Sequence, residues 1–426
     1  MKLKINDRFV VHIFNIIFFW FLFTPILKSV PFGEIFSRAI GVVVLLLSSI
    51  VIANRPIPKA YLRLSISALL FLLYCIFHTV TGEDISGNIA TLIRIYGTFA
   101  LLFTFLTINS SKTLEIIETK IFYLGSICAA YVIAQSLIYK LSPQLAIDLL
   151  GAHQYWGALG ESVRPRGLLN SVGGSASLIA TSIIIRIKRS AASDTDRREK
   201  LLTFLLIVGL ALIFTRTFIL LIIIFSILHF TITNNLRKLT GLILVCVFLF
   251  SAYSIYSPEK LAERLSDLPF ISKTTTSTDQ LFKGRFHLSK IPWEEYKSQD
   301  VLHWIWGNNL NHSTNILINH YESLDETLQS STHNDFIWLL VNLGAMGLVL
   351  YLLFIFRLLS LSRNKSLKLK SITFLYILLF FFLSSLAGES INITGHRYIQ
   401  IIFIALLISK VQQEKSVVNR HPSTSI

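Results

Sequence analysis

The chain has 426 residues, of which 53% are hydrophobic and only 15% charged, and its mean hydropathy is +0.62. This composition excludes an ordinary soluble domain and indicates a protein that has the lipid bilayer as its solvent. The formal net charge of +15 would suggest a nucleic-acid partner in a soluble protein. In a membrane protein the positive charges are first assigned to the two sides of the membrane, and no nucleic-acid partner is expected.

Twelve apolar runs are candidate membrane spans. The first follows a basic N-terminus and resembles a signal peptide, but it is as long as a span and no small-residue cleavage site follows, so we expect it to be retained. Thr215-Arg216-Thr217 interrupts the apolar stretch 201–230, which favours short or tilted helices there. The runs cover residues 9–27, 39–53, 64–80, 89–108, 121–138, 167–185, 201–214, 217–232, 239–254, 335–356, 371–387 and 397–410.

The lysines and arginines give the chain an orientation. With the N-terminus inside, 24 of the 39 lie in inside segments, and the short outside loops are poor in positive charge, as the positive-inside rule demands. We therefore predict an all-α polytopic membrane protein with about twelve spans and both termini in the cytoplasm. Residues 1–254 form an N-terminal bundle of about nine helices, 255–334 a large non-cytoplasmic loop, and 335–426 the C-terminal helices and a cytoplasmic tail.

The long loop has two recognisable parts. Residues 272–279 are polar and are typical of a linker, whereas residues 282–297 could form an amphipathic helix on the membrane surface. No glycine-rich phosphate loop and no alternation of strands and helices occurs, which argues against a nucleotide-binding domain. The three cysteines lie within apolar runs, apart from any histidine at metal-ligand spacing, so we expect neither a disulfide framework nor a zinc site.

Two arginines are candidates for binding an anion. Arg216 breaks a nearly continuous apolar stretch, and arginine at membrane depth is costly enough to suggest a function. Its planar guanidinium suits phosphate oxygens, although at the outer boundary it could equally reach water as an ordinary interfacial charge. Arg285, in Lys283-Gly284-Arg285 of the long loop, is either a solvated charge or the second half of a diphosphate clamp.

His333 stands at the outer mouth of the bundle, immediately before the span 335–356. Thr332 or Asn334 would cap that helix, and Gly344 and Gly347 would allow close helix packing. These structural explanations leave His333 unexplained. An imidazole titrates near neutral pH and can accept a proton from a sugar hydroxyl, although a single histidine also serves structural roles.

A fourth cluster, Arg164-Pro165-Arg166-Gly167 followed by Asn170, opens the sixth predicted span from outside. The two arginines either add positive potential to the same mouth or anchor a helix end. The outer tryptophans, such as Trp293 and Trp304, could stack on sugar rings, but an interfacial aromatic belt also explains them.

Together these motifs carry a family resemblance. Over about residues 201–356 the chain resembles the O-antigen ligase and polymerase superfamily in the order, spacing and common side of three motifs. These are Phe214-Thr215-Arg216-Thr217, Gly284-Arg285, and His333-Asn334-Asp335-Phe336 ahead of Gly344 and Gly347. Residues 166–170 (Arg-Gly-Leu-Leu-Asn) are similar to what polymerases of that superfamily carry at this point, which favours polymerase over ligase.

The resemblance implies a GT-C-like helix bundle in the bacterial inner membrane. It implies an inverting, metal-independent transfer of a glycan from an undecaprenyl diphosphate carrier at the periplasmic face, without a cofactor. Arg216 and Arg285 would bind the diphosphate, His333 would activate the acceptor hydroxyl, and Arg164, Arg166 and Asn334 would support them. The first outer loop lacks an Asp-x-Asp pair, which agrees with metal independence, and the two arginines would neutralise the leaving diphosphate.

Several alternatives stay open. A polymerase would use a second lipid-linked repeat as acceptor, with a chain-length regulator as a further partner, whereas a ligase would use the lipid A core oligosaccharide. Protein O-glycosylation by a related enzyme is a third reading. A secondary transporter would also suit twelve helices, but the halves show no repeat symmetry and intramembrane acids are nearly absent.

Overall fold

The computed structural model describes most of the chain in separate stretches. Outside these stretches lie the predicted span 239–254, the polar segment 272–279 and His333, together with Asn170. The described residues are 5–29, 32–82, 84–142, 144–145, 153–157, 160–169, 171–189, 197–213, 215–235, 285–323, 334–362, 367–383, 385 and 394–420.

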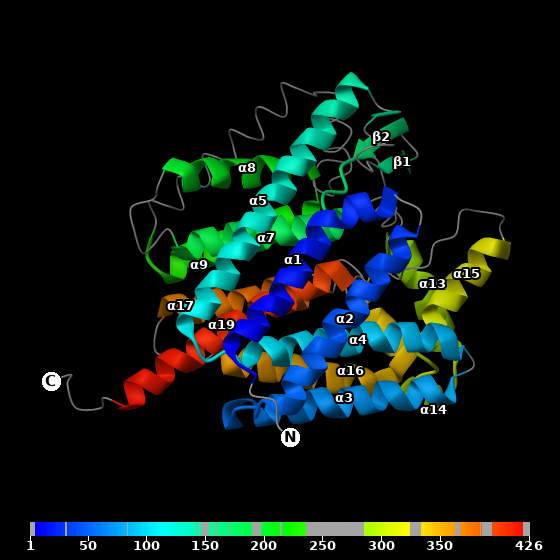
Figure 1. Cartoon of the computed structure of the whole chain (residues 1–426). Helices are drawn as coiled ribbons and strands as arrows, with labels where there is room; N and C mark the ends of the chain where they lie inside the picture. Colours follow the sequence, from blue (N-terminus) through cyan, green and yellow to red (C-terminus); the bar gives the residue numbers. More distant parts are fainter. Residues whose placement is uncertain are drawn as a thin grey trace.

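The described part of the chain is a bundle of α-helices with one small β-hairpin (Figure 1). Eleven of the twelve predicted spans coincide with helices. The elements are α1 (Asp7–Ser29), α2 (Gly33–Asn54), η1 (Lys59–Tyr61), α3 (Leu62–Thr81), α4 (Ile85–Leu106), α5 (Ser111–Leu141), β1 (His153–Gly157), β2 (Gly160–Arg164), α7 (Val172–Arg189), α8 (Arg197–Ile213), α9 (Arg216–Ile232), α13 (Arg285–Ser298), α14 (Val301–Trp306), α15 (His312–Ser323), α16 (Asp335–Leu361), α17 (Leu367–Leu375), η2 (Tyr376–Leu383) and α19 (Thr394–Arg420).

Six of the described helices are long and apolar enough to cross a membrane, namely α1 to α5 and α16. Length and apolar composition are the two properties that a spanning helix needs, so the chain is a multi-pass membrane protein. The helices α9 and η2 are apolar but shorter. The number of twelve spans and the inside position of both termini stay predictions.

The core of the bundle is built around α19. This helix is buried at every position from Arg397 to Ser409, and a helix that is apolar and buried all round must be surrounded by other helices. It packs against α4, α5, α7 and α17. By contrast, α2 and α3 carry exposed apolar side chains, among them Leu46 and Leu73, as expected for surfaces that face lipid.

The β1–β2 hairpin departs from the predicted all-α fold. His153 pairs with Arg164 and Gly157 with Gly160 in an antiparallel ladder. The hairpin and α13 to α15 lie at the same end of the bundle, toward the right in Figure 1, which we call the loop end. The ends of α3 and the starts of α4 and α16 reach this end too.

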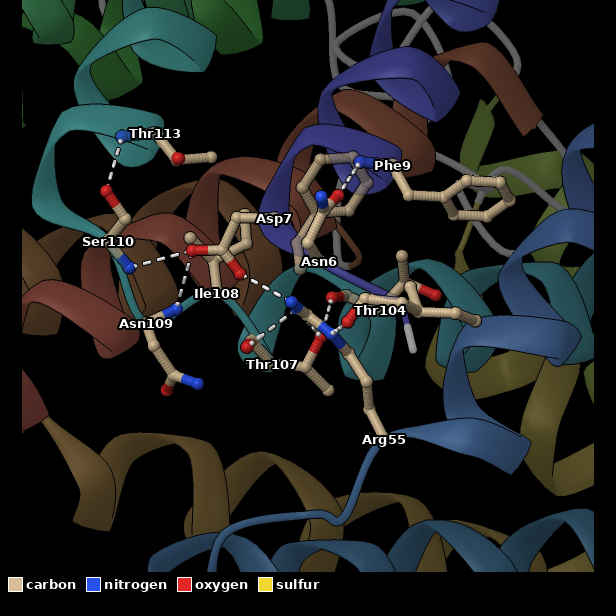
Figure 2. A network of polar contacts seen from close by, with 12 residues as sticks. Asn6, Asp7, Phe9, Arg55, Thr104, Thr107, Ile108, Asn109, Ser110 and Thr113 are labelled. Atoms are coloured by element: carbon tan, nitrogen blue, oxygen red, sulfur yellow. Dashed lines mark hydrogen bonds and ion pairs between the residues drawn. The ribbon is translucent and has the colours of Figure 1, made fainter. Parts of the chain in front are cut away.

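A polar cluster joins the start of α1, the end of α2 and the turn between α4 and α5 (Figure 2). The guanidinium of Arg55, which follows α2, forms an ion pair of 2.6 Å with Asp7 at the start of α1. It also donates to the carbonyl oxygen of Thr107 at 3.0 Å. The second carboxylate oxygen of Asp7 accepts from the backbone N–H groups of Asn109 and Ser110 at 3.3 and 2.9 Å. One ion pair therefore fixes α1, α2, α4 and α5 together.

Replacing Arg55 with methionine should lower the stability of the protein by about 1–3 kcal/mol, because it leaves the Asp7 carboxylate without its charged partner. The Arg55 and Asp7 side chains are only 12% and 17% exposed, so water compensates poorly. The midpoint of thermal unfolding in detergent measures the effect. Arg38→Met is the matched control, since Arg38 pairs with Glu34 at 77% and 71% exposure and exposed pairs contribute little. Equal shifts for the two variants would contradict the assignment.

Candidate active site at the loop end

Arg216 is the first residue of α9. The preceding helix α8 ends at Ile213, and Thr215 has extended backbone angles (φ −89°, ψ 97°), so the chain breaks between the two helices where the sequence predicted an interruption. The Thr215 hydroxyl is buried and has no hydrogen-bond partner among the described residues. Because free N–H groups and the positive end of the dipole gather at a helix start, the start of α9 favours a negative group.

Arg285 is the first residue of α13, the helix expected within residues 282–297. α13 packs against α15 and α16, and Tyr296 within it is buried. The ring of Tyr296 stacks between Trp293 and Trp304, with ring centroids 5.5 and 5.9 Å away. The helix is therefore attached to the protein along one side, whereas its contact with a membrane surface stays a prediction.

The start of α16, two residues after His333, is fixed by two side chains. The side-chain oxygen of Asn334 accepts from the backbone N–H groups of Phe336 and Ile337 at 2.9 and 3.2 Å, which confirms the predicted cap. The carboxylate of Asp335 is fully buried and pairs with Arg397 of α19 at 2.5 Å.

The Arg397 guanidinium is only 2% exposed. It donates to the Ser385 hydroxyl at 3.0 Å and to the carbonyl oxygen of Phe381 at 3.4 Å. It also lies over the Phe381 ring, 4.1 Å from the centroid. These contacts satisfy a charge that would otherwise be very costly to bury. The ion pair thus ties the start of α16 to the most buried helix of the bundle.

An aromatic bridge of four phenylalanines connects the start of α9 with the start of α16. Phe218, two residues after Arg216, contacts Phe380 of η2 at 6.3 Å between ring centroids. Phe382 of the same π-helical segment contacts Phe336, three residues after His333, at 5.2 Å. The two helix starts therefore flank η2, although Arg216 and Asp335 are 119 positions apart in sequence. This places the backbone of Arg216 and the N-terminus of α16 in one region.

The helix α16 is interrupted at Gly344, which has φ 63° and ψ −172°. The sequence interpretation, in which Gly344 allows close packing of a continuous helix, is therefore incomplete. Such angles are open almost only to glycine. The close neighbour of Gly344 is the loop residue Gly307, whose φ is 80°. A Cβ at Gly344 would stand 2.5 Å from the backbone nitrogen of Gly307.

The loop supplies hydrogen-bond donors to the carbonyl groups that this break leaves free. Asn308 donates from its backbone N–H to the Asn342 carbonyl at 2.9 Å and from its side chain to the Val341 carbonyl at 3.1 Å. The Tyr74 hydroxyl of α3 reaches the Leu343 carbonyl at 3.1 Å. Interrupted backbone in a spanning helix is tolerated where other groups of the protein satisfy it. We call Gly307 and Asn308 the loop wedge.

The turn at Arg166 and Gly167 is fixed against α5 and α7. The side chain of Gln135 accepts from the Gly167 N–H at 3.0 Å, and the Ser175 hydroxyl donates to the Arg166 carbonyl at 2.7 Å. Gly167 has φ 64°, which explains the glycine. Burial lowers the pKa of the Arg166 guanidinium from its usual value. Arg164 ends β2, two residues before this turn.

Sequence reasoning missed Arg397, although a signal was present. Arg397 begins an otherwise apolar run, and a charge in such a place is a functional candidate on the same grounds as Arg216. It also missed Asp335 as the partner, because Asp335 was treated only as part of the motif around His333. The positions of the Arg216, Arg285 and Arg164 backbones are described, and the roles assigned to these residues stay proposals.

A comparison with known families identifies the region that contains the break before α9, the long loop and most of α16. A family model described as O-antigen ligase matches residues 201–352. These residues nearly coincide with the stretch that carries the motifs of Arg216, Arg285 and His333. No curated protein matches the chain.

Proposed function

We propose that the chain is a bacterial surface-polysaccharide (O-antigen) polymerase, a member of the O-antigen ligase and polymerase superfamily, whose ligase family model matches residues 201–352. The proposed reaction transfers the glycan of an undecaprenyl diphosphate-linked donor to a sugar hydroxyl of a second lipid-linked repeat unit. It inverts the anomeric configuration and needs no metal ion. The protein would lie in the inner membrane with the loop end and the predicted long loop of residues 255–334 facing the periplasm and both termini in the cytoplasm.

Each proposed residue has one role in the transfer. His333 accepts the proton of the acceptor hydroxyl, whose oxygen attacks the anomeric carbon of the donor. The bond from that carbon to the diphosphate oxygen breaks, and the electron pair leaves on the diphosphate. Arg216 and Arg285 bind this group and neutralise the charge that develops on it. Arg164 and Arg166 add positive potential nearby, and Asn334 holds the start of α16.

The observation that carries the proposal is the aromatic bridge. Through this bridge the start of α9, which bears Arg216, and the start of α16, two residues after His333 in sequence, both contact η2. An inverting transfer needs a base on the acceptor side and cations at the leaving group of the same bond. The wedge supports this reading, because it attaches the loop that carries Arg285 to α16.

Arg216→Ala and His333→Ala should each reduce the formation of long glycan chains by at least about 100-fold, the usual cost of losing a charge-stabilising group or a general base. Both variants should still insert into the membrane. The length distribution of the surface polysaccharide on a gel, together with immunoblots of the membrane fraction, measures both effects. Arg38→Ala, which removes an exposed arginine paired with Glu34, is the control and should give a normal ladder. A normal ladder from Arg216→Ala or His333→Ala would refute the assigned mechanism.

The second candidate is an O-antigen ligase, the activity for which the matching family is named. A ligase would transfer the finished glycan to the lipid A core oligosaccharide. Deleting the gene separates the two: cores that carry a single repeat identify a polymerase, and bare cores identify a ligase. Unchanged glycans with lost uptake of a solute would instead favour a transporter.

A further inference from the structure

A polar pocket lies at the loop end. It measures about 410 Å³, within the usual range for small-molecule sites. Two distant parts of the chain form it: the turn between α3 and α4, and the region of α15. Its lining residues are Asp84, Asn309, His312, Asn315, Ile316 and Asn319.

The lining chemistry suits sugar hydroxyl groups. Asn309, Asn315 and Asn319 each offer an amide that both donates and accepts hydrogen bonds, and a carboxylate accepts from hydroxyls. The lining contains neither lysine nor arginine. A diphosphate would meet the carboxylate of Asp84 without a cation to compensate it, so the pocket disfavours that group.

The carboxylate of Asp84 is held in place. It accepts from the backbone N–H of Gly87 and from the side chain of Asn311, both at 3.0 Å, and caps α4. These hydrogen bonds, the one from the Gly87 N–H first, lower the pKa of Asp84, so its carboxylate is ionised at neutral pH. A fixed acceptor binds a hydroxyl without first losing the freedom of its own side chain.

A buried side-chain amide, that of Asn88, lies close to the lining of this pocket. Asn88 is fully buried, and neither atom of its side-chain amide has a partner among the described residues. A Cβ placed on Gly82 would stand 2.6 Å both from the Asn88 amide nitrogen and from Cβ of the pocket residue Asn309. Asn88 is therefore a close neighbour of the lining, and such an amide needs water or a polar ligand nearby.

The pocket is joined rigidly to α16. The side-chain oxygen of Asn342 accepts from the backbone N–H of Ser313 at 2.7 Å, and its amide donates to the Ser313 hydroxyl at 3.0 Å. Ser313 lies between the pocket residues His312 and Asn315. Seven residues, or about 10 Å of helix, separate Asn342 from the start of α16 at Asp335. The pocket is thus joined to the helix that begins two residues after the proposed base in sequence.

We propose that this pocket binds the phosphate-free sugars of a lipid-linked glycan substrate, remote from its diphosphate. The inference rests on the proposed function for the identity of the glycan. The sugars belong either to the growing donor chain or to the single-repeat acceptor, and both present the same hydroxyl-rich surface.

The test measures binding with two probes on the full-length protein in lipid nanodiscs. The first probe is the phosphate-free oligosaccharide released by mild acid from the host's own lipid-linked repeat, and the second is undecaprenyl diphosphate. Asn315→Phe places a bulky ring in the pocket and should weaken binding of the oligosaccharide at least about tenfold, the equivalent of about 1.4 kcal/mol. Binding of undecaprenyl diphosphate should stay within about twofold of wild type, because this probe carries no sugars to occupy the pocket and loses no interaction there.

Asn109→Phe is the matched control. Asn109 is exposed in the turn after α4, at the opposite end of that helix from Asp84, and the same substitution there should alter neither affinity. If Asn315→Phe is not recovered as folded protein, Asn319→Phe at the exposed rim replaces it. The proposal is overturned if wild type does not bind the oligosaccharide saturably, if the pocket variant binds it normally, or if both probes weaken together.

Kinetics assign the sugars to one substrate. With Asn315→Phe, a rise in KM for the single-repeat substrate at unchanged kcat assigns the pocket to the acceptor, and a rise for the extended substrate assigns it to the donor. If the protein binds the oligosaccharide but gene deletion leaves the glycans unchanged, the proposed function fails while the pocket assignment stands.

Discussion

Arg397→Met should abolish long glycan chains and destabilise the protein by about 3–5 kcal/mol, because it leaves a fully buried carboxylate without its partner. Asp335 is 0% exposed, and no water can replace the lost charge. Since Asp335 directly follows Asn334 and His333, the variant also releases the start of α16. We assign Arg397 as a positioning residue, which acts through α16 without touching the substrate.

A double variant separates stability from positioning. Asp335→Leu combined with Arg397→Met removes both charges, and replacing a buried ion pair with apolar residues is often neutral for stability. The double variant should recover most of the thermal unfolding midpoint that Arg397→Met loses, whereas chain formation should stay low. Arg397→Lys keeps a charge, but it lacks the planar guanidinium that also reaches Ser385 and Phe381, and should recover activity only in part. Full chain formation by the double variant would show that the pair has a structural role alone.

Gly344→Ala should have an effect of similar size, through the backbone. Alanine would have to adopt angles that cost about 1–3 kcal/mol for any residue with a side chain. Its Cβ would also stand 2.5 Å from the backbone oxygen of Ile305, and backbone cannot turn away as a flexible side chain can. We expect the wedge to leave the break, with loss of both stability and chain formation.

Limited proteolysis of the loop in native membranes measures the release of the wedge directly. The control is Gly174→Ala in α7, where the nearest atom to the new Cβ is a leucine methyl group 3.3 Å away and the backbone is helical. This variant should resemble wild type. If the loop of Gly344→Ala is cleaved no faster than that of Gly174→Ala, Gly344 does not hold the wedge.

Hydrophobic length and local capping patterns were sufficient to predict most helices. Each span is defined by its own residues, and the cap at Asn334 and the interruption before Arg216 are likewise properties of a few neighbouring residues. The hairpin at residues 153–164 escaped prediction because its strands are five residues long and show no regular apolar alternation.

The contacts between distant segments could not be predicted in this way. The pair of Asp335 and Arg397 requires knowing that α19 passes the start of α16, and nothing local to either residue gives that. The break at Gly344 is similar, because a glycine within an apolar run indicates close packing as readily as an interruption. Only the position of Gly307 and Asn308 beside the break distinguishes an interrupted helix from a continuous, closely packed one. The polar pocket likewise combines residue 84 with residues 309–319.

The hydrogen bonds at the wedge limit how the loop can be exchanged between related enzymes. A graft of residues 285–323 from a relative would bring its own specificity for sugars. It would also have to donate hydrogen bonds to the Val341 and Asn342 carbonyls, and place a carbonyl group where that of Trp306 accepts from the Tyr74 hydroxyl. A chimaera designed only at the loop's two ends would leave unsatisfied backbone within the bilayer. Swaps that transfer Tyr74 and residues 341–344 together with the loop should therefore be the ones that yield folded enzymes with altered glycan preference.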